Sequence, residues 1–530
     1  MAEQRARQVA DILERNTERA LFVDVRNDEE TTYGALLDAS RRMASFLKER
    51  GVQPGDPVVI SSENCAEYAA LTFACMHVGA RIVPINPAFH PQDFAGILGM
   101  ASGRLFFTTP GIRSRVEETL SALPALETVC FRPSVEPAKK KHEHLVNLDF
   151  QEALAGHKPA NLNLADQDDE TVFLTMFTSG TTSAPKGINV TYRGLVGNGL
   201  AFCRRMGLGR ENRFYNVLPM TYLGGFYNLM LIPFLAEGSF ALDGAFGVPN
   251  VYGFWETVRE YKVNTLWYTP TMLSMLLSLE DDEDLSFLKT SISIALVGLA
   301  PLPVDLKKRF EKRFGFPLYE NYGLSETTFL TTNHPDLPYK DGSIGTALEG
   351  VTVKIVDEQG RPVGARREGQ VLAKTPHFMK GYESAGESDR ANVLDTGEFL
   401  TGDIGYLDED GELFVTGRIK DIIIRGGVNI SPKAIENAFY GMEAVEEVAV
   451  LGVPHPVYGE EVALVVRVKE SEKTKVTVDD LHRYCESHIA HFQRPKLIYI
   501  IDALPKGATG KIQKNVLRKL IAEKVDPLNG

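Results

Sequence analysis

The amino-acid sequence predicts a mainly α/β protein with a large N-terminal part and a smaller α+β part at its C-terminus. Before Gly342, short apolar strands alternate with helices, which is the pattern of a parallel sheet covered on both faces. From about Gly342 the pattern changes to short β segments with frequent glycine. From Ser431 it changes again, to a compact mixture of helices and strands. These two changes divide the chain.

Length, charge and cysteine usage exclude several classes of function. The chain has 530 residues, enough for more than one domain, and a formal net charge of −13, which argues against general binding to nucleic acids or anionic membranes. The sequence shows no apolar run of transmembrane length, and its charged, helix-like N-terminus does not resemble a signal peptide. The five cysteines are odd in number and lack CxxC spacing. We therefore expect reduced thiols in a cytoplasmic protein without a cysteine metal site.

The first elements follow one another in α/β order. Residues 34–50 repeat apolar groups at helical spacing, and Gly51 follows as a helix C-cap. Next come a short strand at Val58–Ile60, an apolar helix at Ala66–Val78 and a second strand at Ile82–Ile85.

The same alternation resumes in the middle of the chain. The expected strands are Arg213–Leu218, Thr265–Tyr268, Ser291–Val297 and Leu318–Tyr322, and the expected helices are Thr271–Leu279 and Asp305–Phe314. Three of these strands run into glycine-containing loops, at Gly224, Gly298 and Gly323. Because loops at the carboxyl ends of parallel strands gather in one crevice, we expect a ligand site there.

The C-terminal half of the chain predicts two further units. The β segments after Gly342 predict a small antiparallel sheet or barrel. We place a domain boundary at Lys420, so that residues 1–419 form an N-terminal domain and residues 420–530 a C-terminal one. Within the latter, the expected elements are a helix from Ser431, strands at Val448–Val453 and Val462–Val468, a helix near Leu481–His488 and a final helix.

The most informative stretch is Thr175–Gly187, TMFTSGTTSAPKG. Its glycines, hydroxyl side chains and single lysine offer the donors and the cation that suit a polyphosphate. Lys186 stands six residues after Gly180, as in a Walker A loop, but Pro185 and Gly187 depart from that motif. The β-branched residues that follow predict a strand, not the helix of a P-loop. We interpret the stretch as a phosphate loop of another design; a flexible surface linker is the alternative.

Four further stretches point the same way as this loop. They are YGLSE (Tyr322–Glu326), TGD (Thr401–Asp403), GRIKD (Gly417–Asp421) and PKGATGK (Pro505–Lys511). With these five motifs in this order, nearly the whole chain resembles the adenylate-forming superfamily of acyl-CoA synthetases, adenylation domains and luciferases, and most of all a stand-alone acyl- or aryl-CoA ligase. Two departures are Ser183, where glycine is usual, and Ser325, where threonine is commoner.

The resemblance implies both a fold and a reaction. The fold is a large N-terminal domain of doubly wound mixed sheets with a small β-barrel-like subdomain, followed by a small mobile α+β domain. In the reaction a carboxylate attacks the α-phosphate of ATP and yields an acyl-adenylate and pyrophosphate, after which a thiol displaces AMP. Mg²⁺ is the implied cofactor and CoA the implied co-substrate. Since the first step joins two anions, it needs cations and hydrogen-bond donors around the α-phosphate.

The resemblance also assigns residues to the nucleotide. The phosphate loop would hold the β- and γ-phosphates through Thr178, Ser179, Gly180, Thr181, Thr182 and Lys186. Tyr322 would stack on adenine; the other residues implied around the nucleotide are Gly298, Ala300, Asn321 and Gly323. Ser325 would bond the α-phosphate, and Glu326 would bind Mg²⁺.

Three more charged residues complete the implied site. Asp403 would accept hydrogen bonds from both ribose hydroxyls, Arg418 would contact ribose and phosphate, and Lys511 would reach the carboxylate and the bridging oxygen. The catalytic set would then be Lys511, Lys186, Ser325 and Glu326. Taken singly, each residue has an ordinary structural alternative: a core tyrosine for Tyr322, a helix N-cap for Ser325, a turn for Asp403, a surface ion pair for Arg418 and a basic tail for Lys511.

In relatives of this kind a hinge lies at the position of Lys420. The C-terminal domain swings between one pose that brings the terminal lysine to the adenylate and another that brings the loop after the hinge. In this chain that loop is IIIRGG, in which Gly426 and Gly427 would let a pantetheine arm pass close to the backbone. Arg425 is a candidate to meet a phosphate of the thiol carrier.

The implied acyl pocket is apolar and aromatic. It would be lined by Tyr222, Leu223, Gly224, Phe226, Tyr227, Val297, Leu299, Thr327 and Phe329. Tyr222 stands where many relatives carry histidine, and no aspartate near Gly224–Asn228 is available to pair with an α-ammonium group. We therefore expect an aryl or aliphatic carboxylate as the substrate and not an amino acid.

Two alternatives to a CoA ligase remain open at this level. The thiol could belong to a carrier protein acting in trans, since no carrier domain follows Lys511. A luciferase-like oxidoreductase is the second alternative, although luciferases carry lysine where Gly426 stands. The expected partners are accordingly a small carboxylate, ATP and CoA, with no nucleic acid.

Overall fold

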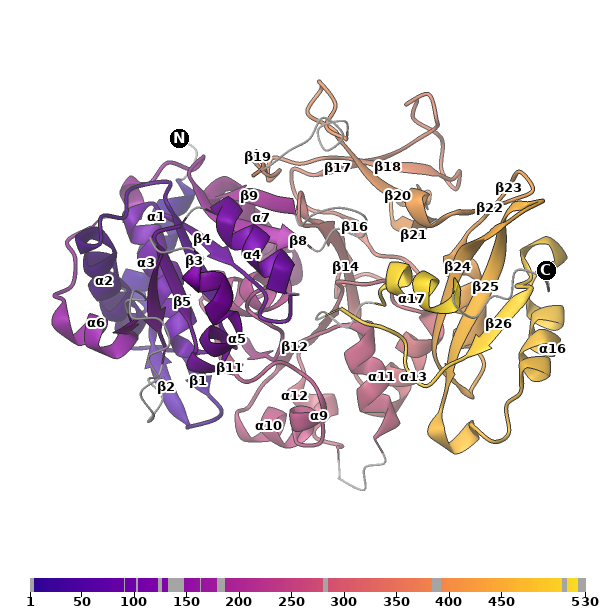
Figure 1. Cartoon of the computed structure of the whole chain (residues 1–530), viewed down its shortest axis with the longest axis horizontal. Helices are drawn as coiled ribbons and strands as arrows, with labels where there is room; N and C mark the ends of the chain where they lie inside the picture. The colour runs from indigo at the N-terminus through magenta and orange to yellow at the C-terminus, as the bar shows by residue number, and fades with distance from the viewer. Residues whose placement is uncertain are drawn as a thin grey trace.

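The computed structural model describes residues 4–89, 91–101, 103–122, 126–131, 147–162, 164–178, 186–279, 285–383, 392–507 and 512–522. In this part of the chain the strands form two large mixed sheets, a small antiparallel sheet and a C-terminal sheet. Figure 1 shows the large sheets and their helices at the left and centre, the small sheet at the top and the C-terminal unit at the right. The predicted fold class is confirmed.

Among the described residues, one large sheet has eight strands in the order β19-β9-β8-β4-β3-β5-β6-β7. Its strands are β3 (Pro57–Ser61), β4 (Arg81–Pro84), β5 (Leu105–Thr108), β6 (Glu127–Cys130), β7 (Asn147–Asp149), β8 (Val172–Thr178), β9 (Lys186–Thr191) and β19 (Gly381–Tyr382). Strands β3 to β8 pair in parallel, whereas β9 runs antiparallel to β8 and β19 antiparallel to β9. The accompanying helices are α1 (Arg5–Arg15), α2 (Tyr33–Glu49), α3 (Ala66–Val78), α4 (Pro91–Ala101), α5 (Pro110–Ser121), α6 (Phe150–Gly156), η1 (Leu164–Asp166) and α7 (Tyr192–Met206).

The other large sheet has nine described strands in the order β16-β15-β14-β13-β12-β10-β11-β1-β2. Its strands are β1 (Ala20–Asp24), β2 (Glu29–Thr32), β10 (Arg213–Asn216), β11 (Ser239–Leu242), β12 (Thr265–Tyr268), β13 (Ile294–Val297), β14 (Tyr319–Leu324), β15 (Thr328–Thr332) and β16 (Thr346–Ala347). The central strands are parallel and the two edges antiparallel. Its helices are η2 (Gly224–Leu231), α8 (Ile232–Leu235), α9 (Val248–Val251), α10 (Phe254–Glu260), α11 (Pro270–Ser278), α12 (Leu288–Ser291) and α13 (Val304–Phe314).

Local sequence signals explain where the predicted helices begin and end. The Thr32 hydroxyl caps α2 by accepting a hydrogen bond from the Ala35 backbone N–H. Helix α3 is buried on every side and ends at Gly79, whose φ of 73° lies in the left-handed region that glycine tolerates. The predicted bounds of α3 are confirmed residue for residue.

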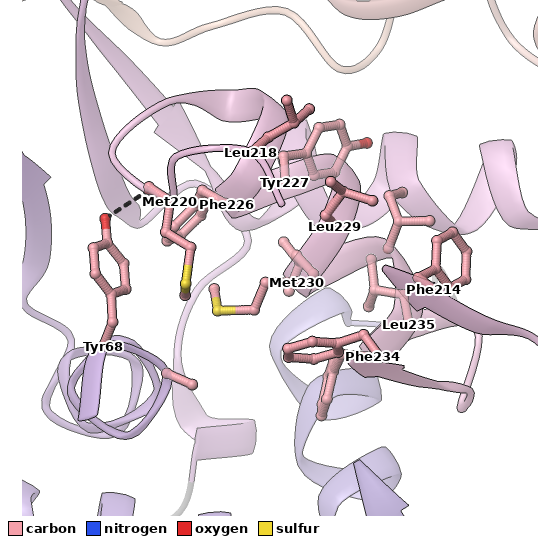
Figure 2. Close-up of a cluster of buried hydrophobic side chains, with 14 of the residues drawn as sticks. Tyr68, Phe214, Leu218, Met220, Phe226, Tyr227, Leu229, Met230, Phe234 and Leu235 are labelled. Atoms are coloured by element: carbon pink, nitrogen blue, oxygen red, sulfur yellow. Dashed lines mark hydrogen bonds between the residues drawn. The ribbon is translucent and has the colours of Figure 1, made fainter. Parts of the chain in front are cut away.

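The main hydrophobic core extends over both large sheets, and one part of it lies where α3 meets η2, a π-helix. Figure 2 shows Tyr68 of α3 beside Met220 and Phe226, with Tyr227, Leu229 and Met230 continuing along η2. Tyr68 is fully buried, and its hydroxyl donates to the Met220 carbonyl oxygen over 2.9 Å. Burial of each large side chain of this kind stabilises the fold by roughly 1.5–3 kcal/mol. The core therefore fixes the start of η2, which borders the expected ligand crevice.

The region after Gly342 forms an antiparallel sheet, as predicted. Its order is β17-β18-β20-β21 within the described residues, with β17 (Thr352–Val356), β18 (Gly369–Lys374), β20 (Phe399–Leu407) and β21 (Leu413–Arg418). Between β18 and β20 the chain returns to the eight-stranded sheet, where it adds β19 to β9. The sequence predicted either a small antiparallel sheet or a barrel, and the structure has an open antiparallel sheet.

The C-terminal unit is α+β and has hydrophobic clusters of its own. Its described elements are η3 (Ile419–Asp421), β22 (Ile423–Arg425), β23 (Val428–Ile430), α15 (Pro432–Tyr440), β24 (Val445–His455), β25 (Gly459–Val468), η4 (Glu470–Glu472), α16 (Val478–His488), η5 (His491–Gln493), β26 (Leu497–Ile500) and α17 (Lys514–Ala522). One cluster packs Ile435 and Phe439 of α15 against β24 and β25, and another packs Leu517 of α17 on the opposite sheet face.

Candidate active site

The YGLSE motif lies on a tight hairpin at the edge of the nine-stranded sheet. Strand β14 carries Tyr322, the turn carries Ser325 and Glu326, and β15 returns antiparallel. Ser325 therefore lies in a turn between two strands, and the structural alternative of a helix N-cap at this residue is wrong. A Cβ added to Gly323 would lie 2.0 Å from the Thr328 carbonyl oxygen, so only glycine fits here.

Tyr322, Asp403 and Arg418 come together from three strands. The Tyr322 hydroxyl donates to Asp403 Oδ2 over 2.6 Å, and Arg418 Nε contacts Asp403 Oδ1 over 2.7 Å. Asp403 is 2% exposed. Burial, and then the Asp403 carboxylate, raise the pKa of Tyr322 well above its usual value, so its hydroxyl remains a donor. Because each oxygen of a carboxylate can accept two hydrogen bonds, Asp403 keeps acceptor capacity for hydroxyl groups of a ligand.

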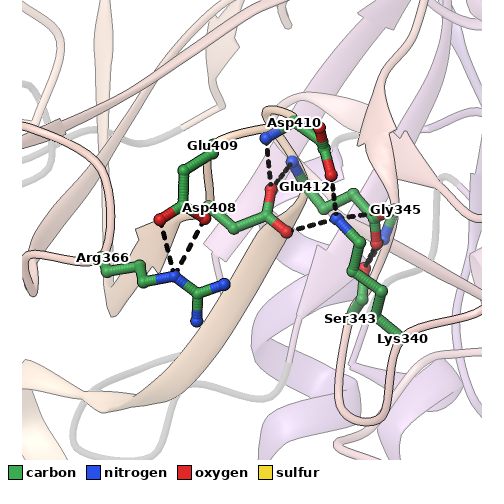
Figure 3. Close-up of polar contacts among 8 residues, drawn as sticks. All are labelled: Lys340, Ser343, Gly345, Arg366, Asp408, Glu409, Asp410 and Glu412. Carbon is green, nitrogen blue, oxygen red and sulfur yellow. Dashed lines mark hydrogen bonds and ion pairs between the residues drawn. The ribbon is translucent and has the colours of Figure 1, made fainter.

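An ion cluster fixes the β20–β21 hairpin that carries Asp403 and Arg418. Figure 3 shows the Lys340 ammonium among Asp408, Asp410 and Glu412, at 2.5, 2.6 and 3.3 Å. The backbone of Leu413 also donates to the Gly345 carbonyl oxygen over 2.9 Å. The segment after β15 is thereby joined to this hairpin, which holds Asp403 opposite Tyr322.

Glu326 is half-buried and belongs to a second polar group. The Tyr382 hydroxyl donates to Glu326 Oε1 over 3.1 Å, and the Met379 N–H donates to the Glu326 carbonyl oxygen over 2.8 Å. No group of three or more His, Cys, Asp or Glu side chains suited to a metal occurs in the described ranges. One carboxylate still fits Mg²⁺, which binds proteins through one or two carboxylates together with substrate phosphates.

The stretch predicted to bind phosphate lies between two antiparallel strands. Strand β8 runs to Thr178 and β9 begins at Lys186, and these two residues are register partners. The predicted strand after the loop is confirmed, and the connection is shorter at both ends than the predicted 175–187. The assigned loop residues Ser179, Gly180, Thr181 and Thr182 lie outside the described residues, as do Lys511 and the Thr178 side chain.

The segments around Gly224 and Gly298 meet, but not all three glycines lie in loops: Gly224 begins the π-helix η2, and Gly323 lies within β14. A Cβ on Gly224 would lie 2.9 Å from Leu299 Cδ1, and a Cβ on Gly298 would lie 2.4 Å from Asn321 Oδ1. Asn321 Nδ2 donates to the Val297 carbonyl oxygen over 3.0 Å. The carboxyl end of β13, the middle of β14 and the start of η2 therefore lie next to one another, and Ala300 directly follows Leu299 in the sequence.

The expected acyl-pocket residues divide into two groups. Tyr222 and Leu223 are half-buried, and Leu299 is 41% exposed. The others are buried: Gly224, Phe226, Tyr227, Val297, Thr327 and Phe329. The rings of Tyr227 and Phe329 stack at 5.3 Å within the main core.

Sequence reasoning missed Asn198, which organises this core. Its Oδ1 accepts hydrogen bonds from the Tyr227 hydroxyl at 2.9 Å and from the Phe329 N–H at 3.0 Å. Its Nδ2 donates to the Phe329 carbonyl oxygen over 2.9 Å. The sequence signal for this role is an asparagine within the apolar stretch GLVGNGLAF. A side-chain amide buried in such surroundings needs hydrogen-bond partners.

The residues implied for the thiol tunnel form a tight hairpin in the C-terminal unit. Gly426 and Gly427 have φ of 59° and 83°, as a two-residue turn between β22 and β23 requires. Arg425 Nε contacts Glu461 Oε1 over 3.0 Å, and both side chains are mostly buried. Arg425 is thus paired within its own unit. Lys420 is exposed in η3, directly before this hairpin.

Helix α15 holds the C-terminal unit against β21. The Ser431 hydroxyl donates to the Thr416 carbonyl oxygen over 2.7 Å, and the Lys433 ammonium donates to that of Val415. Burial lowers the pKa of Lys433. The C-terminal unit therefore sits next to the strand that carries Arg418.

Family models match both parts of the chain. Residues 9–383 match the model described as AMP-binding enzyme, and residues 434–511 match the AMP-binding enzyme C-terminal domain. The chain belongs to the AMP-binding enzyme family. The resemblance drawn from the five motifs is confirmed.

Individual relatives of this AMP-binding enzyme are CoA ligases. Oxalate–CoA ligase of Arabidopsis thaliana is 30% identical and covers 93% of this chain and 94% of its own. Feruloyl-CoA synthase of an Amycolatopsis species is 30% identical over 92% of this chain and 93% of its own. The crystal structure of ATP-bound MatB from Rhodopseudomonas palustris is 25% identical, has a TM-score of 0.87 and covers 98% of this chain and 100% of its own.

These matches confirm the predicted enzyme class, an AMP-forming acid–thiol ligase of the acyl-CoA synthetase type. They do not favour the carrier-protein alternative. No helix among the described residues has the length and apolarity needed to span a membrane.

Proposed function

We propose that this enzyme joins an aryl or aliphatic carboxylate to CoA in two steps, both in one crevice between the glycine loops and the two hairpins. ATP and the carboxylate first form an acyl-adenylate and pyrophosphate. The CoA thiol then attacks the acyl carbon, and AMP leaves with the bond electrons. The observation that carries the proposal is that residues of three separate motifs meet: Tyr322 and Arg418 both contact the buried carboxylate of Asp403.

In the first step the residues of the chain bind and orient ATP. Asp403 accepts from the ribose hydroxyls, and Arg418, already paired with it, lies in position to contact ribose and phosphate. Lys186 at the start of β9 contacts the β- and γ-phosphates, and Ser325 donates to the α-phosphate. Mg²⁺, when bound to Glu326 and phosphate oxygens, would neutralise phosphate charge during the attack.

The substrate carboxylate enters beside Tyr222 and Leu299. Both are partly exposed, and burial raises the pKa of Tyr222, so its hydroxyl is a neutral donor toward a carboxylate oxygen. Lys511 brings the cation that lowers the repulsion between the two anions. We place the reaction in the cytoplasm, which the five unpaired cysteines support.

The deciding experiment measures pyrophosphate release over a library of aryl and aliphatic carboxylates, with ATP and Mg²⁺, with and without CoA. We expect one group of acids to release pyrophosphate, and CoA to convert that signal into continuous turnover with an acyl-CoA product. Turnover with a phosphopantetheinylated carrier protein but not with CoA would support the carrier alternative. Absence of ATP-dependent pyrophosphate release across the whole library would refute the proposal.

A further inference from the structure

The segment Met379–Glu383 joins two parts of the proposed nucleotide site. At one end, Met379 and Tyr382 donate to Glu326, as described above. At the other, the Glu383 N–H donates to the Gly187 carbonyl oxygen over 2.7 Å. The segment therefore sets the distance between the turn that carries Glu326 and the strand that begins with Lys186.

Four side chains close a ring of hydrogen bonds beneath this segment. Arg81 Nη2 donates to Glu383 Oε1 over 2.6 Å, and Arg81 Nη1 donates to Thr175 Oγ1 over 2.9 Å. The Thr175 hydroxyl donates to Asn189 Oδ1 over 2.7 Å. Asn189 Nδ2 donates to Glu383 Oε2 over 3.0 Å and completes the ring. The members come from β4, β8, β9 and the residue after β19.

The ring lies at the base of the phosphate hairpin. Thr175 and Asn189 are register partners across β8 and β9, three residues from Thr178 and Lys186 respectively. Arg81 donates a hydrogen bond directly to Thr175 of β8. It is connected to Asn189 of β9 through Glu383, which accepts from both residues. Its guanidinium therefore fixes both strands relative to the parallel sheet.

The members of the ring are largely shielded from water. The side chains of Arg81 and Glu383 are 15% and 18% exposed, and Thr175 is fully buried. Burial alone would raise the pKa of Glu383, but the hydrogen bonds from Arg81 and Asn189 outweigh it and lower that pKa. A satisfied polar network in such surroundings is rigid, and loss of one member leaves charged partners unpaired.

The packing of Glu383 on the hairpin is also close. A Cβ added to Gly187 would lie 2.9 Å from Glu383 Cβ and 3.0 Å from the Phe177 ring. The lack of a side chain at Gly187, a residue of the predicted phosphate motif, therefore allows Glu383 to pack against the β9 backbone.

We propose that Arg81 and Glu383 are a positioning pair that holds Lys186 and Glu326 at the spacing required by the β- and γ-phosphates of ATP. This inference rests on the proposed function. Neither residue touches the nucleotide; both act through the backbone of β9 and through the Met379–Glu383 segment. AMP lacks the two phosphates, so its binding should not depend on the pair.

The test compares the affinities of Mg²⁺·ATP and AMP by calorimetry in the full-length protein. The variants are Glu383→Gln, Arg81→Met and the double variant. Arg50→Met is the matched control, because Arg50 forms a 2.8 Å ion pair with Glu127 in the same sheet, away from the hairpin. We expect about tenfold weaker ATP binding in each single variant, since a hydrogen bond between charged groups is lost. AMP binding and the control should stay at wild-type affinity.

The double variant adds a second readout. If the two residues act as a pair, it should bind ATP no more weakly than the poorer single variant. Unchanged ATP affinity in Glu383→Gln overturns the inference. An equal loss of ATP and AMP affinity also overturns it, because such a loss shows that the pair has only a general structural role. Glu383→Gln keeps the side-chain shape, and its melting temperature checks that it folds. A wild-type protein that binds neither nucleotide refutes the proposed function itself.

Discussion

The Tyr322 hydroxyl donates a hydrogen bond to Asp403 across 81 positions of sequence. The bond connects the β14–β15 hairpin of the nine-stranded sheet to the β20–β21 hairpin of the small sheet. Because Asp403 also pairs with Arg418, one buried carboxylate organises the adenine, ribose and phosphate contacts that we propose. In the proposed site this carboxylate accepts hydrogen bonds from the protein and the nucleotide at the same time, so its replacement should weaken nucleotide binding directly.

Asp403→Asn should weaken AMP and ATP binding by about tenfold or more, since charge-assisted hydrogen bonds to ribose are replaced by neutral ones. Calorimetry with either nucleotide gives the affinities. Tyr322→Phe is the matched control: it removes one hydrogen bond to Asp403 and keeps the carboxylate and the ring, so its effect should be smaller. Equal losses in the two variants would argue that Asp403 acts only through Tyr322.

Lys511→Ala should nearly abolish adenylate formation and leave thioester formation from supplied acyl-adenylate mostly intact. The lost cation stabilises the approach of two anions, and its removal is worth roughly 3–4 kcal/mol in the transition state. Single-turnover assays of each half-reaction measure the split. A similar loss in both half-reactions would contradict the idea that this lysine serves only one pose of the C-terminal unit.

Lys420→Pro should retain one half-reaction, which we expect to be adenylation, and lose most of the other. Proline fixes φ near −65° and removes the N–H, so the linker before β22 can no longer change conformation. Lys420→Ala is the control and should behave like the wild type, because the backbone and not the ammonium is at issue. Normal rates of both half-reactions in Lys420→Pro would place the hinge elsewhere.

Glu320→Gln should change how stability depends on pH. Burial raises the pKa of Glu320 to about 7 from a usual 4.5, although Lys307 and a hydrogen bond from Tyr339 oppose the shift. Between these two values the folded state holds a proton that the unfolded state has released, so the free energy of unfolding falls as pH rises. The glutamine variant lacks this contribution, which is at most about 3 kcal/mol.

Urea unfolding of both proteins at pH 5 and pH 8 measures the effect. The stability of the variant relative to the wild type should rise from pH 5 to pH 8, because only the wild type must bury an ionised carboxylate at the higher pH. The neighbouring charges, which also include Lys433 and Glu311, are present in both proteins and cancel in this comparison. Parallel pH profiles would show that Glu320 does not titrate in this range.

Much of the fold and the identity of the family could be predicted from the sequence, because the relevant signals are local. The apolar run and closing glycine of Ala66–Val78 define a buried helix without reference to any other segment. The strand at Thr265–Tyr268 was likewise visible from its own residues. Motif residues such as Asp403 and Arg418 stood out because their types and order suit the chemistry of adenylation.

What the sequence by itself determined, then, is the order of elements and the inventory of chemical groups. Only the tertiary structure decided which groups meet. It brought Asn198 to Tyr227 and to the backbone of Phe329, residues that are far apart in the sequence. It also brought Arg81 to Glu383, 302 positions away, through a two-residue strand with too little local pattern to predict. Such contacts depend on strand order and register, which follow from packing the whole chain and not from the periodicity of any one segment.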